Sequence, residues 1–184
     1  MKKVMLHICC SICFLEPYKH LREEQFEIIG FFNNPNIQPY TEYLERLNAL
    51  KNIVKINNTS LIVPNEYSIE EYHDSVVKVL DVQKLRCKEC YNFRLTKTAQ
   101  LSKANKIQYF STTLLASPYQ DINSILEVGH KISEEYKIEF IWSNKWLDNY
   151  YKSKEEIRKK ELYIQKYCGC LYSKMERKFS EGEK

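Results

Sequence analysis

The chain has 184 residues, 28 of them basic and 24 acidic, with 13% aromatic content and a net charge of +4. This length suits one domain of about 100–200 residues, and the aromatic content argues against a disordered chain. No apolar run approaches the ~20 residues of a membrane span, and residues 1–10 are too short for a secretion signal. We therefore expect a single cytoplasmic domain over residues 1–184, without a membrane partner.

Short apolar runs alternate with helical patterns along the chain. The predicted strands are 3–8, 27–32, 61–63, 108–112 and 137–142. The predicted helices are 17–24, 41–51, 69–80, 90–104, 121–136 and 153–166. Thr41 and Asp121 are the expected amino-terminal caps of two of these helices. The alternation predicts a three-layer α/β fold, with helices on both faces of a mostly parallel, five-stranded sheet and a helical carboxy-terminal arm.

Seven cysteines fall into three tight groups, which is the least ordinary feature of the composition. These groups are Cys9, Cys10 and Cys13; Cys87 and Cys90; and Cys168 and Cys170. An odd number of cysteines without a secretion signal does not suit a disulfide scaffold. Clustered cysteines in a reducing compartment more often bind metal or carry out redox chemistry.

Each cysteine group has a local feature that favours reactive or metal-bound sulfur. Cys9 and Cys10 follow a strand, at the edge where open α/β sheets bind ligands, and a helix amino terminus there stabilises a thiolate. The Cys87 group has basic neighbours that compensate thiolates or a negative cluster. Gly169 lets the sulfurs of the last pair point the same way, and a disulfide between them would be strained and labile.

Several site classes compete for these cysteines. A structural zinc would use four thiolates and leave three unexplained, and 73 residues separate the two CxxC halves against about 15–20 in a compact zinc ribbon. Cys10 and Cys13 alone match a thiol–disulfide exchange motif. The grouping favours an iron–sulfur or related redox metal site, with a metal-free dithiol oxidoreductase, a zinc-stabilised RNA-binding module and inert buried cysteines as the alternatives.

Two further regions offer ligand-binding groups. Residues 111–120 follow the fourth strand with hydroxyls and amides, either as a polar ligand site or as an ordinary capped loop; the candidate substrate-binding residues are Ser117, Tyr119 and Gln120. Residues 152–184 hold ten Lys or Arg and six Asp or Glu, so this arm carries the whole charge excess. It suits either a phosphate backbone or a solvated, ion-paired helix. Aromatic residues near it are suited to stacking a base or to packing in the core: Trp142, Trp146, Tyr150 and Tyr151.

Four motifs in order resemble the cobalamin-independent epoxyqueuosine reductase family. They are HICC at 7–10, RCKECYNFRL at 86–95, STTLLASPYQ at 111–120 and YCGCLYS at 167–173. Together they span nearly the whole chain. The family's first motif usually continues with Ala-Pro and then Cys or Asp, whereas this chain has Ser11, Ile12 and Cys13.

The resemblance implies a Rossmann-like fold, similar to the adenine-nucleotide alpha-hydrolase (PP-loop) group. No Ser-Gly-Gly phosphate loop follows the first strand, so we expect no use of ATP. The implied activity is the last step of queuosine biosynthesis, the reduction of epoxyqueuosine to queuosine in the wobble nucleotide of tRNA. An external electron donor would supply this reaction, and the basic arm would hold the anticodon stem.

The resemblance also implies roles for the cysteines. Cys9, Cys10, Cys87 and Cys90 would be the ligands of a [4Fe–4S] cluster. Cys168 and Cys170 would be a redox-active pair or ligands of a second iron ion, and Cys13 is a candidate ligand of that second metal. Candidate proton donors are His7, Tyr119 and Asp121.

Overall fold

Five parallel strands form the central layer, close to where the sequence predicts them. The computed structural model describes residues 2–180. The strands are β1 (Lys2–His7), β2 (Phe26–Phe31), β3 (Ser60–Ile62), β4 (Tyr109–Thr112) and β5 (Glu139–Phe140). Their order is β3-β2-β1-β4-β5, and all four neighbouring pairs are parallel. This is the strand order of doubly wound dinucleotide-binding sheets, so the predicted Rossmann-like α/β fold is confirmed.

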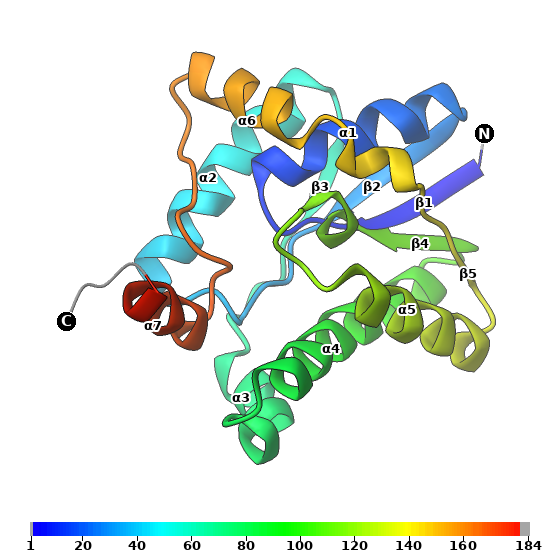
Figure 1. Cartoon of the computed structure of the whole chain (residues 1–184). Helices are drawn as coiled ribbons and strands as arrows, with labels where there is room; N and C mark the ends of the chain where they lie inside the picture. The colour runs from blue at the N-terminus through cyan, green and yellow to red at the C-terminus, as the bar shows by residue number, and fades with distance from the viewer. Residues whose placement is uncertain (1, 181–184) are drawn as a thin grey trace.

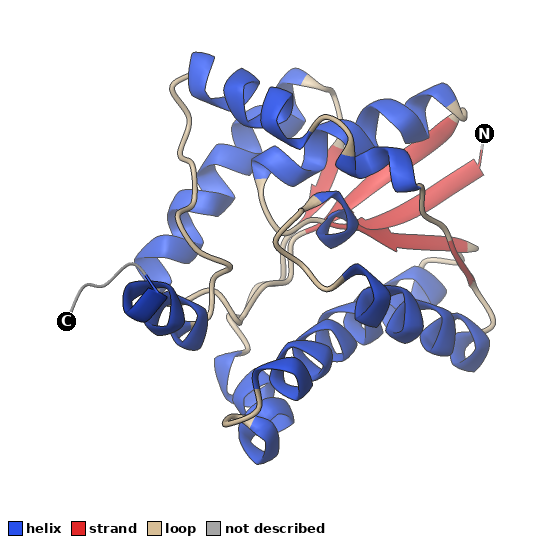
Figure 2. Ribbon diagram, viewed as in Figure 1, coloured by secondary structure: helices blue, strands red, loops and turns tan. Residues whose placement is uncertain are grey.

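Helices cover both faces of the sheet. They are α1 (Ser11–Glu23), α2 (Tyr40–Ile56), α3 (Ile69–Val76), α4 (Gln83–Ala104), α5 (Ile122–Tyr136), α6 (Tyr150–Lys159) and α7 (Leu171–Ser180), with short 3-10 turns η1 (Val77–Val79), η2 (Thr113–Ala116) and η3 (Asn144–Leu147). Helices α1 and α2 pack on one face with α6 against α1, and α4 and α5 cover the other face (Figure 1). Figure 2 shows the strands enclosed between these two helical layers. No helix in the described part of the chain is long and apolar enough to cross a bilayer.

The central strand β1 positions the first cysteine group. Val4, Met5 and Leu6 are fully buried, because β1 has a neighbouring strand on each side and helices on both faces. The strand order reverses between β1 and β4, and such reversals open a crevice at the carboxyl edge of a sheet. The segments that follow β1 and β4 therefore meet at that crevice.

Two helices that carry cysteines begin earlier than the sequence predicts. Helix α1 begins at Ser11 instead of residue 17, because the sulfur of Cys10 caps it by accepting a hydrogen bond from the Cys13 N–H. Helix α4 begins at Gln83 instead of residue 90, which places both cysteines of the CxxC on one helix. The earlier starts set the geometry of the first two cysteine groups.

The predicted caps have opposite outcomes. Asp121 caps α5 through a hydrogen bond from the Ser124 N–H, as predicted. The predicted cap at Thr41 is wrong: α2 begins at Tyr40, its capping position is Pro39, and no side chain caps it. Thr41 lies inside the first turn of the helix.

The carboxy-terminal region departs most from prediction. Helix α6 ends at Lys159 instead of residue 166, because Glu161 adopts a left-handed conformation (φ 55°) and the chain turns. Leu162 and Ile164, which follow the turn, pack against the core. Helix α7 is not predicted from the sequence. Strand β5 is also shorter than predicted, since the left-handed Lys137 (φ 57°) still belongs to the end of α5.

Candidate metal centre

The first cysteine group lies directly after β1. The sulfur atoms of Cys9, Cys10 and Cys13 all lie within 4.8 Å of one another, and those of Cys9 and Cys10 are 3.9 Å apart. Two thiolates on one tetrahedral ion, each bonded at about 2.3 Å, stand about 3.8 Å apart. Cys10 and Cys13 are buried, and Cys9 is half-buried. The spacing and chemistry of these donors fit a bound metal.

Hydrogen bonds in this group stabilise negative charge on Cys10. The thiols of Cys13 and Cys9, in that order, hold the pKa of Cys10 well below its usual value. The Cys13 backbone N–H lies 3.5 Å from the Cys10 sulfur, and the side-chain amide of Gln165 donates to it at 2.8 Å. The hydrogen bond with Cys10 raises the pKa of Cys9 to about 11. The group therefore favours a single thiolate at the amino terminus of α1, where the helix dipole adds to its stability.

His7 joins the ends of three segments beneath these sulfurs. Its ring nitrogens lie 2.8 Å from the Thr112 hydroxyl and 3.1 Å from the Asn34 side-chain oxygen. Asn34 in turn donates to the Ile8 carbonyl at 2.8 Å. Burial, and secondarily the charge of Arg94, lowers the pKa of His7 to about 4. A fully enclosed, neutral imidazole holds the loops in place, and this argues against His7 as a proton donor.

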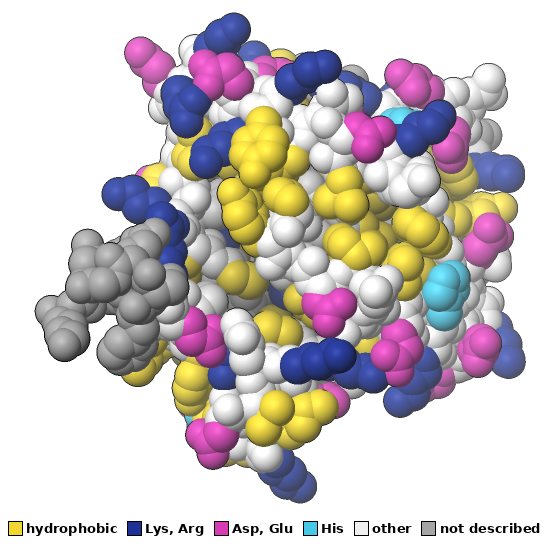
Figure 3. All heavy atoms as spheres, in the orientation of Figure 1, with side chains coloured by type: hydrophobic (Ala, Val, Ile, Leu, Met, Phe, Trp, Pro, Cys, Tyr) yellow, Lys and Arg dark blue, Asp and Glu magenta, His cyan; other side chains and the backbone are white. Residues whose placement is uncertain are grey.

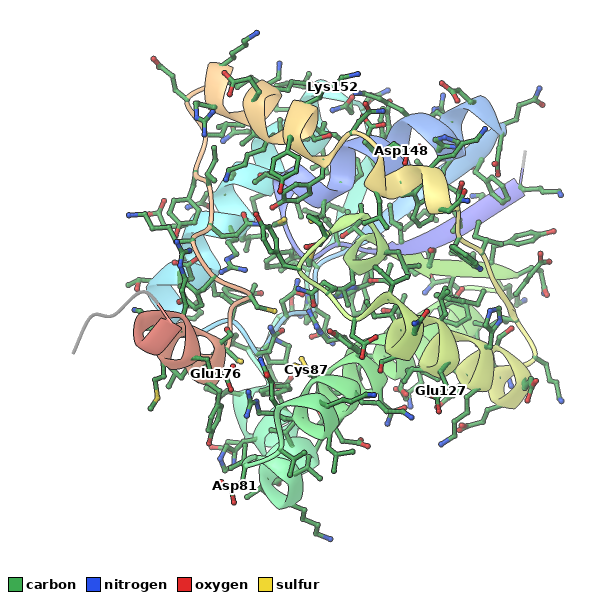
Figure 4. All side chains as sticks on the ribbon, viewed as in Figure 1. Asp81, Cys87, Glu127, Asp148, Lys152 and Glu176 are labelled. Atoms are coloured by element: carbon green, nitrogen blue, oxygen red, sulfur yellow. The ribbon has the colours of Figure 1, made fainter. Side chains whose placement is uncertain are left out.

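The other two cysteine groups face each other across a second cavity. This cavity, of about 400 Å³, is lined by Cys87 and Cys90 from α4 and by Cys168 and Cys170. In Figure 4 the Cys87 side chain points from α4 toward the central space. The first cavity, of about 440 Å³, is lined by all three sulfurs of the first group and again by Cys168. Cys168 thus borders both cavities, so the fold brings the three groups to one region.

These groups differ in compactness. Among the described residues, only the first group brings three possible metal-ligating atoms within 4.8 Å of one another. Burial raises the pKa of Cys87 to about 12 and also raises the pKa of Cys90. Without a cation, these two thiols therefore stay protonated, and a bound metal would have to displace their protons.

Arg94 supplies a buried positive charge at this region. Its side chain is 1% exposed and lines the second cavity, and its Nε donates to the Cys90 carbonyl at 3.2 Å. Its Nη2 has no hydrogen-bond partner among the described residues. Burial alone would lower the pKa of Arg94, but the facing Cys90, Cys168 and Cys9 hold it above its usual value. A buried guanidinium with an unused donor fits an anionic group in the adjoining space.

Arg46 fixes the backbone that carries the last cysteine pair. Its guanidinium is buried and donates to the carbonyls of Tyr167 and Cys168, both at 2.9 Å. Its Nε is paired with Glu42 at 2.8 Å. Arg46 therefore connects α2 to a segment more than 120 residues later in the chain.

Gly169 shapes the same segment. Its φ of 139° lies where side chains are strained, and its carbonyl accepts a hydrogen bond from the Gln38 N–H at 2.8 Å. A Cβ atom there would lie 3.0 Å from Ile37. The backbone conformation and the close approach of Ile37 therefore favour glycine at position 169, whatever reaction the two neighbouring thiols carry out.

Helix α7, which follows the last cysteine pair, is anchored to α4. Glu176 forms an ion pair with the buried Arg86 and accepts a hydrogen bond from Gln83 at 3.2 Å. Figure 4 shows Glu176 on the side of α7 that faces α4. The ring of Tyr172 lies under the Arg86 guanidinium at 4.6 Å. The arm therefore returns to the site that holds the other cysteines.

The candidate substrate-binding residues all line the first cavity. Ser117 is buried and Tyr119 is exposed. Gln120 borders both cavities; its side chain accepts a hydrogen bond from the Tyr91 hydroxyl at 3.1 Å, and its Nε2 lies 3.6 Å from the Cys168 sulfur. The carboxylate of Asp121 is occupied in capping α5, which lowers its pKa and argues against it as a proton donor.

The aromatic residues divide between core and surface. Trp146 and Tyr150 are buried, while Trp142 and Tyr151 are exposed. Sequence reasoning missed Arg46 and Gln165, which touch the cysteine-bearing segments. The spacing of Glu42 and Arg46 in one helix was the available signal, but it does not reveal that the pair faces inward.

Comparisons with known proteins identify the family of the chain. The family described as epoxyqueuosine reductase QueH matches residues 4–176. The chain is 36% identical over 190 residues to the epoxyqueuosine reductase QueH of Thermotoga maritima, with 100% of this chain and 96% of that protein covered. It is 32% identical over 176 residues to that of Dehalococcoides mccartyi, with 95% and 94% covered. With that of Helicobacter pylori it shares 34% identity over 182 residues, covering 92% of this chain and 49% of that protein.

Replacing Gly169 tests whether the backbone of the last cysteine pair is as constrained as described. We expect Gly169→Ala to destabilise this segment locally by about 1–3 kcal/mol, because it combines a strained φ with a close approach to Ile37. Trypsin should then cleave after Lys166 faster than in the unmodified protein. The control Glu155→Ala removes an exposed ion pair on α6 and should leave that rate unchanged. Equal cleavage of Gly169→Ala and the unmodified protein would contradict the assignment.

Proposed function

The chain belongs to the epoxyqueuosine reductase QueH family and is an oxidoreductase that reduces epoxyqueuosine in tRNA to queuosine, and we propose that its three cysteine groups form the metal centre of this reaction. The observation that carries the proposal is the convergence of all three groups on two adjoining cavities that share Cys168. The tRNA substrate and the relatives' shared name favour the cytoplasm as its location.

We assign Cys9, Cys10, Cys87 and Cys90 as the four ligands of a [4Fe–4S] cluster. The pairs come from the carboxyl end of β1 and from α4, and both sit within the electrostatic reach of Arg94. Four thiolates and a cluster carry net negative charge, which the buried guanidinium compensates. Cys13 then remains as a ligand of a second iron ion, beside Cys9 and Cys10 and on the same cavity as Cys168.

The reaction defines what the other residues must provide. Removing the epoxide oxygen breaks both of its carbon–oxygen bonds, releases water and leaves an alkene, at the cost of two electrons and two protons. When bound, the cluster supplies electrons one at a time from an external donor. Oxidation of the Cys168 and Cys170 dithiol to a disulfide releases two electrons and two protons, which matches this requirement; as ligands of the second iron, the same thiols would instead hold a Lewis acid.

The first cavity is the proposed place of the modified base. Ser117 and Gln120 offer a hydroxyl and an amide there, and the Tyr91 hydroxyl orients Gln120 beside the Cys168 sulfur. Substrate groups bound by Gln120 would therefore lie next to a redox-active thiol. We propose that residues 1–184 act as one domain, with the basic arm 152–184 holding the anticodon stem of the tRNA.

Anaerobic purification with metal analysis tests the metal centre. We expect a brown protein with roughly four or more irons and matching sulfide, bleached by dithionite. Cys87→Ser and Cys90→Ser should lose the cluster, because each removes one of its four ligands. Cys13→Ser, the matched control, should keep about four irons and lose the additional one.

Three results of that experiment would contradict the assignment. A colourless protein with stoichiometric zinc would favour a zinc-stabilised RNA-binding module. A metal-free protein that cycles between dithiol and disulfide would favour the dithiol oxidoreductase. A cluster that survives Cys87→Ser but is lost in Cys13→Ser would replace Cys87 by Cys13 in the ligand set.

The charge of Arg94 gives a separate prediction for the cluster potential. Removing a buried cation disfavours the more negative, reduced state, so Arg94→Met should lower the midpoint potential by on the order of tens of mV. A redox titration followed by electron paramagnetic resonance measures this shift. Lys97→Met, a change of a half-exposed cation on the same helix, is the control and should leave the potential unaltered. Equal potentials in Arg94→Met and the unmodified protein, both folded and loaded with iron, would refute the role of Arg94.

A further inference from the structure

We propose that Tyr119 and Tyr151 form a base-stacking platform at the first cavity, which holds the unpaired nucleotides beside the modified one in the anticodon loop. The inference rests on the proposed function, since it takes the modified base to enter that cavity. It adds an RNA contact that neither the cysteine motifs nor the family relationship specifies.

The two rings are exposed but rigidly backed. Tyr119 is 67% exposed and Tyr151 is 68% exposed. The buried Tyr150 packs against both, with its ring meeting Tyr119 at 5.7 Å and Tyr151 at 5.4 Å, both edge-on. Tyr150 and Tyr119 line the first cavity. A buried ring therefore backs two exposed aromatic rings, and one of the two, Tyr119, lines the same cavity as the first cysteine group.

The charge around the cavity matches a phosphate backbone. Its described lining contains four basic side chains and no Asp or Glu: Arg46, Lys154, Lys166 and Arg177. Arg46 is engaged by Glu42 and by the backbone of the last cysteine pair. Within residues 2–180, neither Lys154 nor Lys166 forms an ion pair. Lys154 also lies three residues from Tyr151 on α6, so a cation and a stacking ring share one side of that helix.

The surface view agrees with this arrangement. Figure 3 shows hydrophobic side chains gathered around a hollow near the middle of the face, with Lys and Arg side chains close to them. Aromatic rings next to a cavity whose described lining has cations but no Asp or Glu suit single-stranded RNA better than an apolar protein segment. Lys152 on α6 points outward at the same end of the molecule (Figure 4).

The chemistry of the substrate explains why stacking surfaces are needed there. An enzyme that acts on a base takes it out of the stack, and its neighbours then lose a stacking partner. Aromatic side chains replace that partner in most sequence-tolerant contacts with single-stranded RNA. Two rings beside the entrance are placed to receive the neighbours of a base that enters the cavity.

Binding of an RNA stem-loop tests the platform independently of catalysis. The probe is the anticodon arm of a tRNA with guanosine at the wobble position, and a fully paired duplex of the same length is the comparison. The protein is the anaerobically purified holoenzyme, and fluorescence anisotropy at one fixed salt concentration gives the Kd. The variants are Tyr119→Leu and Tyr151→Leu, with Tyr119→Phe and Tyr151→Phe as ring-preserving partners.

Each leucine variant should raise the Kd for the stem-loop by about 5- to 150-fold, the range for loss of one base–aromatic stack. The phenylalanine variants should bind like the unmodified protein, and duplex binding should not change in any variant. Trp142→Leu is the matched control, since Trp142 is exposed and aromatic but lines neither cavity and, unlike Tyr119 and Tyr151, does not pack its ring on Tyr150. Thermal melting checks that each variant is folded.

Leucine variants that bind the stem-loop like the unmodified protein would overturn the platform. The same conclusion follows if they weaken stem-loop and duplex equally, because the loss would then not depend on unpaired bases. If the unmodified, iron-loaded protein binds neither RNA, the platform fails together with tRNA as the substrate carrier. Iron content is measured separately, so failure of the platform is distinguishable from failure of the metal centre.

Discussion

The reversal of strand order between β1 and β4 is the constraint on which the site depends. It opens one crevice at the carboxyl edge of the sheet, where the segments that follow β1 and β4 meet. The first cysteine group lies there, and His7 joins the neighbouring segments beneath it. Helix α4 and the carboxy-terminal segment bring the remaining cysteines to the same place. Residues far apart in the sequence therefore meet because parallel strands end at one edge.

Bringing seven thiols together creates an electrostatic problem, and two features of the fold address it. The amino terminus of α1 and the surrounding hydrogen bonds stabilise a thiolate on Cys10. Arg94 provides a buried positive charge between the groups. Burial raises the pKa of Cys87 and Cys90, so both thiols stay protonated when no metal is bound. In our proposal a bound metal is the partner that allows them to become anionic. The unused donor of Arg94 fits the same proposal.

The strands and their parallel arrangement could be predicted because buried strands are nearly continuous apolar runs, as in β1. The family could be recognised because its motifs are local in sequence. The start of α1 could not be predicted, since a cysteine is an unusual helix cap. The turn at Glu161 was also hidden, because a charged residue in a left-handed conformation gives no warning in the pattern. Contacts of Arg46 with Tyr167 and Cys168 depend on tertiary structure alone.

This chain reduces epoxyqueuosine in tRNA, and in our proposal it does so at a metal centre bound by its cysteines. The most direct test is mass-spectrometric analysis of tRNA nucleosides from a bacterial strain that lacks its own epoxyqueuosine reductase and expresses this chain. We expect that queuosine replaces the accumulated epoxyqueuosine, and that a Cys90→Ser variant restores none. Persistent epoxyqueuosine in cells that contain the folded, iron-loaded protein would contradict the account.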